Sequence, residues 1–122
     1  FAKALGNNEN AHLFINCRWS EPEVRDEIIA EINRHRCNNI HYTEICLKQD
    51  AYLKFFQSVD CLLSLSKGEG FSIQPREAMA LGIPVILTNN TAQSTICESG
   101  LAKVIASTIP EPRYYFKRPI PD

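Results

Sequence analysis

Short apolar runs alternate with amphipathic stretches along most of the chain, and the two patterns predict two kinds of element. The apolar runs have the usual length of buried strands, and we expect strands at 12–16, 40–43, 61–65, 84–88 and 102–105. Spacings of three and four residues, together with breaker residues, predict helices at 1–5, about 20–36, 48–59, about 74–81 and 91–97.

This alternation of strands and helices predicts a Rossmann-like α/β domain, in which a doubly wound parallel sheet is covered by helices. The run at 61–65 is nearly all apolar, so we expect that strand to be covered on both faces. We assign residues 1–109 to this domain and residues 110–122 to a proline-rich C-terminal segment. The prolines exclude a regular central strand there, and 113–116 would form either a short edge strand or a docking loop.

Breaker and capping residues predict where the helices begin and end. Ser20 and Glu23 have the spacing of a capping box, in which the two side chains satisfy backbone amides of the first turn. Gly82 should stop the helix that starts near Gln74, and Gly6 with the next two residues should stop the first helix in a left-handed conformation. Residues 88–90 are interpreted as a turn, with contact to a ligand as the alternative.

Charge and cysteine content exclude several classes of function. The 13 basic and 14 acidic residues leave a net charge of −1, which supplies no field for nucleic acid and no polybasic membrane surface. No apolar run approaches the roughly 20 residues of a membrane span. The five cysteines are scattered, so we expect free and mostly buried thiols in a reducing compartment and no metal site.

The candidate chemistry lies in the loop after the third predicted strand, since ligands of open α/β sheets bind beyond the carboxyl ends of strands. This loop, 66–72, contains two glycines and leads into a helix start, where free amides favour anions. Glu69 lies on the loop and Glu77 lies eight positions later in the helix. Carboxylates accept hydrogen bonds from vicinal hydroxyls, so together the groups would suit a sugar linked to a phosphate.

The run E-G-F-S-I-Q-P-R-E-A-M-A-L-G-I-P-V-I at 69–86 resembles the E-x7-E signature of GT-B glycosyltransferases, family four of the retaining enzymes. The family pattern is roughly E-G-F-G-x-x-x-x-E-A-M-A-x-G-x-P-V-I, and the match is dense over 52–88. The resemblance implies the C-terminal, donor-binding lobe of a GT-B fold. It also implies transfer of a sugar from a nucleotide-diphosphate sugar to an acceptor, with retention at the anomeric carbon.

The resemblance also implies roles for individual residues. Glu69 would bind hydroxyls of the donor sugar, and Glu77 would bind the ribose hydroxyls. The backbone amides of the loop would hold the sugar and the diphosphate, namely those of Gly70, Phe71, Ser72 and Ile73. The base would lie near Ile45 and Cys46, held mostly by backbone. We assign no catalytic base, expect no metal and no cofactor beyond the nucleotide-sugar substrate, and expect Phe71 to pack rather than to react.

The expected partners and location follow from the same resemblance. The acceptor would be a glycan, a lipid or a protein, bound by an N-terminal lobe that this sequence does not include, and no nucleic acid is expected. We expect the protein in the cytoplasm, with peripheral association of the full-length protein at the cytoplasmic face of a membrane as an option. An isolated lobe should transfer nothing.

The sequence departs from the family pattern at Ser72, which replaces a glycine and should reshape the turn. The family's first strand and its arginine–lysine pair are not visible. We therefore expect an N-terminally incomplete lobe in which the strands near 12–16 and 61–65 lack the central strand between them. These departures leave a degenerate lobe with a regulatory or assembly role as the alternative. A receiver or flavodoxin-like module would need an acidic pocket or a flavin loop, and neither is found.

Overall fold

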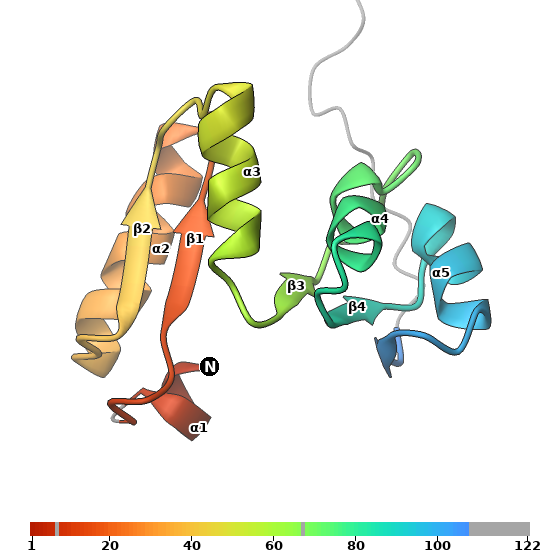
Figure 1. Cartoon of the computed structure of the whole chain (residues 1–122). Coiled ribbons are helices and arrows are strands. Elements are labelled where there is room, and N and C mark those ends of the chain that lie inside the picture. Colours follow the sequence, from red (N-terminus) through yellow and green to blue (C-terminus); the bar gives the residue numbers. More distant parts are fainter. Residues whose placement is uncertain (7, 67, 108–122) are drawn as a thin grey trace, which may run out of the picture. The chain divides into compact units, whose positions relative to one another are not determined.

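The computed structural model describes residues 1–6, 8–66 and 68–107 of the 122-residue chain. The chain divides into two compact units, Phe1–Leu53 and Lys54–Asp122, which are described separately. In the described part, helices alternate with strands and every strand pair is parallel, as the sequence predicts. The chain is therefore α/β, and Figure 1 labels its elements.

The first unit contains a two-stranded parallel sheet (Figure 1). In its register, Leu13 lies opposite Ile40. Its elements are α1 (Ala2–Leu5), β1 (Leu13–Asn16), α2 (Pro22–His35), β2 (Ile40–Thr43) and most of α3 (Gln49–Gln57). Asn39, which is 5% exposed, lies just before β2 and fixes the chain ahead of β1. Its Nδ2 donates to the carbonyl oxygens of Leu5, Asn8 and Ala11 at 2.8, 3.1 and 2.7 Å.

The second unit contains a three-stranded parallel sheet with the order β3-β4-β5. Its elements are β3 (Leu62–Ser64), α4 (Ile73–Ala80), β4 (Val85–Thr88), the 3-10 turn η1 (Thr91–Gln93), α5 (Ser94–Glu98) and β5 (Lys103–Ile105). The central strand β4 carries the core, since Val85 and Leu87 are 2% and 0% exposed. Buried side chains from α4 and α5, Ala78 and Ile96, belong to the same unit.

The strands of the described residues form two separate sheets, β1-β2 and β3-β4-β5. The expectation that the run at 61–65 is covered on both faces was wrong. Leu63 and Leu65 are 41% and 55% exposed. Since side chains alternate between the two faces of a strand, these residues lie on one face, and that face is open.

One predicted helix start is wrong, and both predicted helix stops are confirmed, one of them with a different backbone conformation. The capping box at Ser20 is wrong: α2 begins at Pro22 with Glu21 as its N-cap, and no side chain caps it. Gly6 ends α1 in a right-handed conformation, with φ at −60°, rather than a left-handed one. A side chain at Gly6 would meet the carbonyl oxygen of Ala2 and Sγ of Cys37, so close packing explains this glycine. Gly82 stops α4 as predicted, with φ at 75°.

All five cysteines are free thiols, as expected, but the expectation that most of them are buried was wrong. Cys37 is buried, Cys17 and Cys97 are half-buried, and Cys46 and Cys61 are exposed. The segment at 113–116 and the whole proline-rich stretch at 110–122 lie outside the described residues, so the interpretations of both stay predictions.

Candidate functional site

The loop between β3 and α4 exposes the residues that the sequence singles out. Glu69, Gly70 and Phe71 are exposed, and the loop leads directly into the first turn of α4. Ile73 is the first residue of α4, and its side chain is 57% exposed. Amides at a helix start have no partner within the helix, so this end of α4 can donate to an anion beside the Glu69 carboxylate.

Ser72 takes the left-handed conformation that a glycine would have provided. Its φ and ψ are 59° and 61°, it is the N-cap of α4, and it is 4% exposed. Its Oγ has no hydrogen-bond partner among the described residues. Ser72 therefore keeps a positive φ although it carries a Cβ. The packing around Ser72 maintains a conformation that costs a residue with a Cβ about 1–2 kcal/mol.

Glu77 is half-buried on α4, four residues after Ile73 and therefore on the same face of the helix. The second unit thus holds six of the residues that the sequence singles out, namely Glu69, Gly70, Phe71, Ser72, Ile73 and Glu77. Glu69 and Glu77 differ in environment, since the first is exposed and the second is half-buried.

Arg76, on α4, contacts this loop and was missed by the sequence analysis. Its Nε donates to the carbonyl oxygen of Phe71 at 3.1 Å, and its Nη2 donates to Oγ1 of Thr95 at 2.9 Å. The guanidinium therefore connects the loop to α5 through two donors held in one plane. The sequence could have indicated this contact, because Arg76 lies in the first turn of α4, within reach of a loop carbonyl oxygen.

The turn after β4 braces the loop after β3. Asn90 Nδ2 donates to the carbonyl oxygen of Ser66 at 2.6 Å, and Thr88 Oγ1 lies 2.8 Å from the same oxygen. Gln93, which is fully buried, donates from Nε2 to Ser64 Oγ at 2.6 Å. The chain turns at residues 89–90, directly after Thr88 ends β4, and the side chains of Thr88 and Asn90 hold the loop that carries Glu69.

The first unit carries the other two predicted site residues, Ile45 and Cys46, just after β2. Asn16 accepts from the Ile45 amide at 3.3 Å and donates to the Ile45 carbonyl oxygen at 3.3 Å. The backbone polar groups of Ile45 are therefore already engaged, and this residue offers its 52% exposed side chain instead. Cys46 is exposed beside it.

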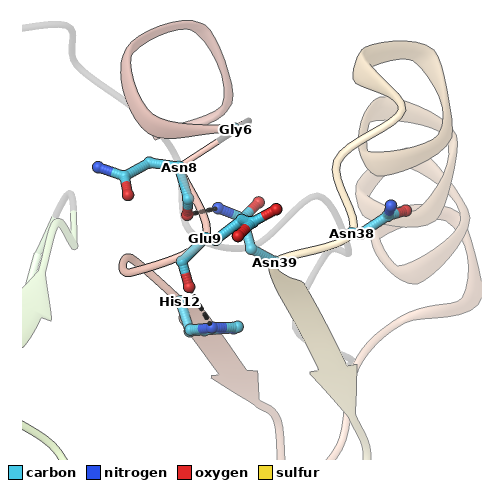
Figure 2. Close-up of a pocket in the computed structure, with 6 residues that line it drawn as sticks. All are labelled: Gly6, Asn8, Glu9, His12, Asn38 and Asn39. Atoms are coloured by element: carbon cyan, nitrogen blue, oxygen red, sulfur yellow. Dashed lines mark hydrogen bonds between the residues drawn. The ribbon is translucent and has the colours of Figure 1, made fainter.

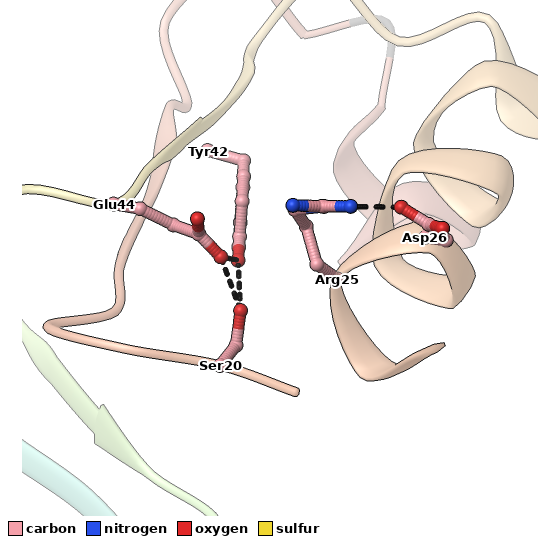
Figure 3. A network of polar contacts seen from close by, with 5 residues as sticks. All are labelled: Ser20, Arg25, Asp26, Tyr42 and Glu44. Atoms are coloured by element: carbon pink, nitrogen blue, oxygen red, sulfur yellow. Dashed lines mark hydrogen bonds and ion pairs between the residues drawn. The ribbon is translucent and has the colours of Figure 1, made fainter. Parts of the chain in front are cut away.

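A polar cluster lies at the same end of the β1-β2 sheet (Figure 3). Tyr42 Oη donates to Glu44 at 2.7 Å, and Ser20 Oγ contacts both Glu44 and Tyr42, the latter at 2.9 Å. Hydrogen bonds from Ser20, and then from Tyr42, lower the pKa of Glu44. Arg25 pairs with Asp26 at 3.0 Å, which raises the pKa of Arg25. Ser20 is thus committed to this cluster and is not available as a helix cap.

A pocket of about 360 Å³ lies at the opposite end of β1 and β2, where both strands begin (Figure 2). Its lining is polar and comprises Gly6, Asn8, Glu9, His12, Asn38 and Asn39. His12 contacts the carbonyl oxygen of Glu9 through Nε2 at 3.2 Å. None of the residues that the sequence singles out as a site lines this pocket.

Two features are absent from the described residues, namely a cluster of metal ligands and a helix that could span a membrane. No group of three or more His, Cys, Asp or Glu side chains in 1–6, 8–66 and 68–107 is arranged to hold a metal ion. Within the same ranges, no helix has both the length and the apolar character needed to cross a membrane.

Comparison with known proteins gives one match. A family model described as glycosyl transferases group 1 matches residues 2–112, which is most of the chain. No curated protein and no solved structure matches significantly.

Proposed function

The chain belongs to the glycosyl transferases of group 1, and we propose that it forms the donor-binding half of a retaining enzyme of this family. In this proposal the enzyme transfers a sugar from a nucleotide-diphosphate sugar to an acceptor. The observation that carries the proposal is the loop between β3 and α4, where exposed Glu69 stands beside the free amides of a helix start.

Each residue of this loop has a role in the proposal. Glu69 binds hydroxyls of the donor sugar, and its exposed carboxylate is available for this. Glu77, one turn inside α4, binds the ribose hydroxyls. The backbone amides of Gly70, Phe71, Ser72 and Ile73 hold the sugar and the diphosphate, supported by the left-handed turn at Ser72.

The base of the nucleotide is assigned to Ile45 and Cys46 after β2. Since the backbone of Ile45 is engaged by Asn16, we propose that the exposed Ile45 side chain packs against the base. The backbone amide and carbonyl groups of Cys46 then remain available for polar contact with the base. Asn16 keeps this segment in one conformation, which lowers the entropy lost on binding.

The proposed chemistry depends on positioning and electrostatics. Negative charge grows on the leaving diphosphate as the sugar departs through an oxocarbenium-like transition state. The amides at the start of α4 stabilise that charge, without a metal ion in our proposal. Glu69 orients the sugar and is not assigned as a nucleophile. We place the protein in the cytoplasm, where nucleotide sugars are made, and assign acceptor binding to another lobe.

The test is a binding titration of the protein with UDP-, GDP- and ADP-sugars, beside Glu77→Ala. Saturable binding of one nucleotide, lost in Glu77→Ala and kept in the exposed-glutamate control Glu98→Ala, is the expected result. If the folded protein binds none of the three, the donor-binding function is wrong. The regulatory or assembly role of a degenerate lobe would then be favoured.

A further inference from the structure

The peptide groups on both sides of Glu69 are held by the turn after β4. The Glu69 amide donates to Thr91 Oγ1 at 2.8 Å, and the Ala92 amide donates to the Glu69 carbonyl oxygen at 3.4 Å. Two consecutive residues of η1 thus contact the N–H and the C=O of one residue in the preceding loop. Such a pair of contacts fixes both the position and the rotation of the Glu69 backbone.

Thr91 makes this contact from a strained conformation. Its φ is 41°, in the left-handed region that β-branched residues rarely enter. Glycine would occupy this position without strain but would have no hydroxyl. Strain that persists in a folded protein indicates that the surroundings favour the residue for another reason.

Glycine would lack the hydroxyl of Thr91, which both accepts and donates a hydrogen bond. While it accepts from the Glu69 amide, it donates to Asn90 Oδ1 at 3.2 Å. Asn90 is itself fixed, because its Nδ2 donates to the Ser66 carbonyl oxygen at 2.6 Å. Asn90 therefore orients the Thr91 hydroxyl so that an oxygen lone pair faces Glu69.

We propose that Thr91 is a positioning residue that fixes the Glu69 backbone, so that the Glu69 carboxylate is aimed at the donor sugar; this rests on the function proposed above. Thr91 itself touches no substrate. Its effect should appear in the sugar part of the donor and not in the nucleotide part, whose ribose is assigned above to Glu77.

Three variants separate the hydroxyl from the backbone strain. Thr91→Val keeps the shape and the β-branch but removes the acceptor. Thr91→Ser keeps the hydroxyl, and Thr91→Gly removes both the hydroxyl and the strain. If the hydroxyl positions Glu69, Thr91→Ser should preserve the preference for the donor sugar, while Thr91→Val and Thr91→Gly should lose it. Glycine should lose it although it adopts the left-handed region with the least strain.

The first readout needs no ligand. Hydrogen exchange at the Glu69 amide should become about five- to tenfold faster in Thr91→Val, as expected for the loss of one hydrogen bond, and should stay near the wild-type rate in Thr91→Ser. Unchanged exchange at Glu69 in a folded Thr91→Val protein would overturn the proposal.

The second readout compares a nucleotide sugar with its own nucleoside diphosphate, for example UDP-glucose with UDP. Wild-type protein should bind the sugar-bearing form more tightly. Thr91→Val should reduce that preference about five- to tenfold, with affinity for the diphosphate unchanged and with Thr91→Ser near wild type. A preference that survives in Thr91→Val would overturn the role of Thr91 and leave the donor-binding function intact. A wild-type protein that binds no nucleotide would remove the function and this inference together.

Discussion

The guanidinium of Arg76 lies over the ring of Phe71, with its central carbon 4.6 Å from the ring centroid. This is a cation–π contact, and the same guanidinium also donates to the Phe71 carbonyl oxygen. Phe71 remains 62% exposed, so the expectation that it packs holds only against Arg76 and not against the core. Arg76 therefore holds the loop by the backbone and by the side chain of one residue.

Replacing Arg76 by lysine should weaken this arrangement although the charge is kept. Lysine lacks the planar fork that reaches Phe71 and Thr95 together, so the free energy of unfolding should fall by about 1–2 kcal/mol. Urea denaturation measures this. The control is Arg34→Lys, because Arg34 is 71% exposed and its ion pair with Glu31 should contribute little. Equal effects of the two variants would contradict the prediction.

The conformation of Gly82 predicts a contrast between two glycine substitutions. Gly82→Ala should lower the free energy of unfolding by about 1 kcal/mol, because φ at Gly82 is 75°. Gly70→Ala should have little effect or slightly stabilise the protein, since its added Cβ would meet no atom within 4 Å. Thermal unfolding of both variants checks this, and a larger loss in Gly70→Ala would show that the left-handed turn is not what requires glycine.

Asn39 should be far more sensitive than its neighbour Asn38. Asn39→Asp removes the donors to three carbonyl oxygens while keeping the shape of the side chain, and should lower the free energy of unfolding by about 2–3 kcal/mol. Asn38→Asp introduces the same charge at an exposed position and serves as the control. Denaturant unfolding at neutral pH measures both. Similar midpoints would mean that these hydrogen bonds do not hold the segment before β1.

The Ser20–Tyr42–Glu44 cluster predicts an acid-dependent loss of stability. Since the pKa of Glu44 is lowered in the folded state, its contribution is complete above its ordinary value of 4.5 and is lost as the pH falls through the lowered pKa. Ser20→Ala should raise the pKa of Glu44, and Tyr42→Phe should do so as well. A carbon-13 NMR titration of the Glu44 carboxyl group checks this. An unchanged Glu44 titration in both variants would contradict it.

The elements were predictable from sequence because their signals are local. Apolar runs and breaker residues lie next to the strands and helices that they define, so β2 was placed at 40–43 as observed. The prediction of a helix cap at Ser20 failed because the hydrogen-bond partners of Ser20, Tyr42 and Glu44, lie 22 and 24 positions away. A local capping pattern cannot anticipate such distant competition for one hydroxyl.

The candidate site was identified from its resemblance to a family signature, and the roles of its residues stay predictions. The contacts that support the loop were not predicted. Thr91 reaches the loop from η1, 22 positions after Glu69, and only the folded arrangement brings it there. Arg76 lies five positions from Phe71, and its contact is local. The left-handed conformation of Ser72 was missed for a related reason, because intrinsic preference disfavours it and tertiary packing imposes it.

The exposed thiol of Cys46 is a native site that an alkylating reagent can modify. It directly follows Ile45, so alkylation at this sulfur samples the position proposed for the base. The other exposed thiol, Cys61, has a pKa raised by desolvation and so presents less thiolate to an alkylating reagent. Slower modification of Cys46 in the presence of a nucleotide, read by mass spectrometry, would therefore map ligand contact without any engineered residue.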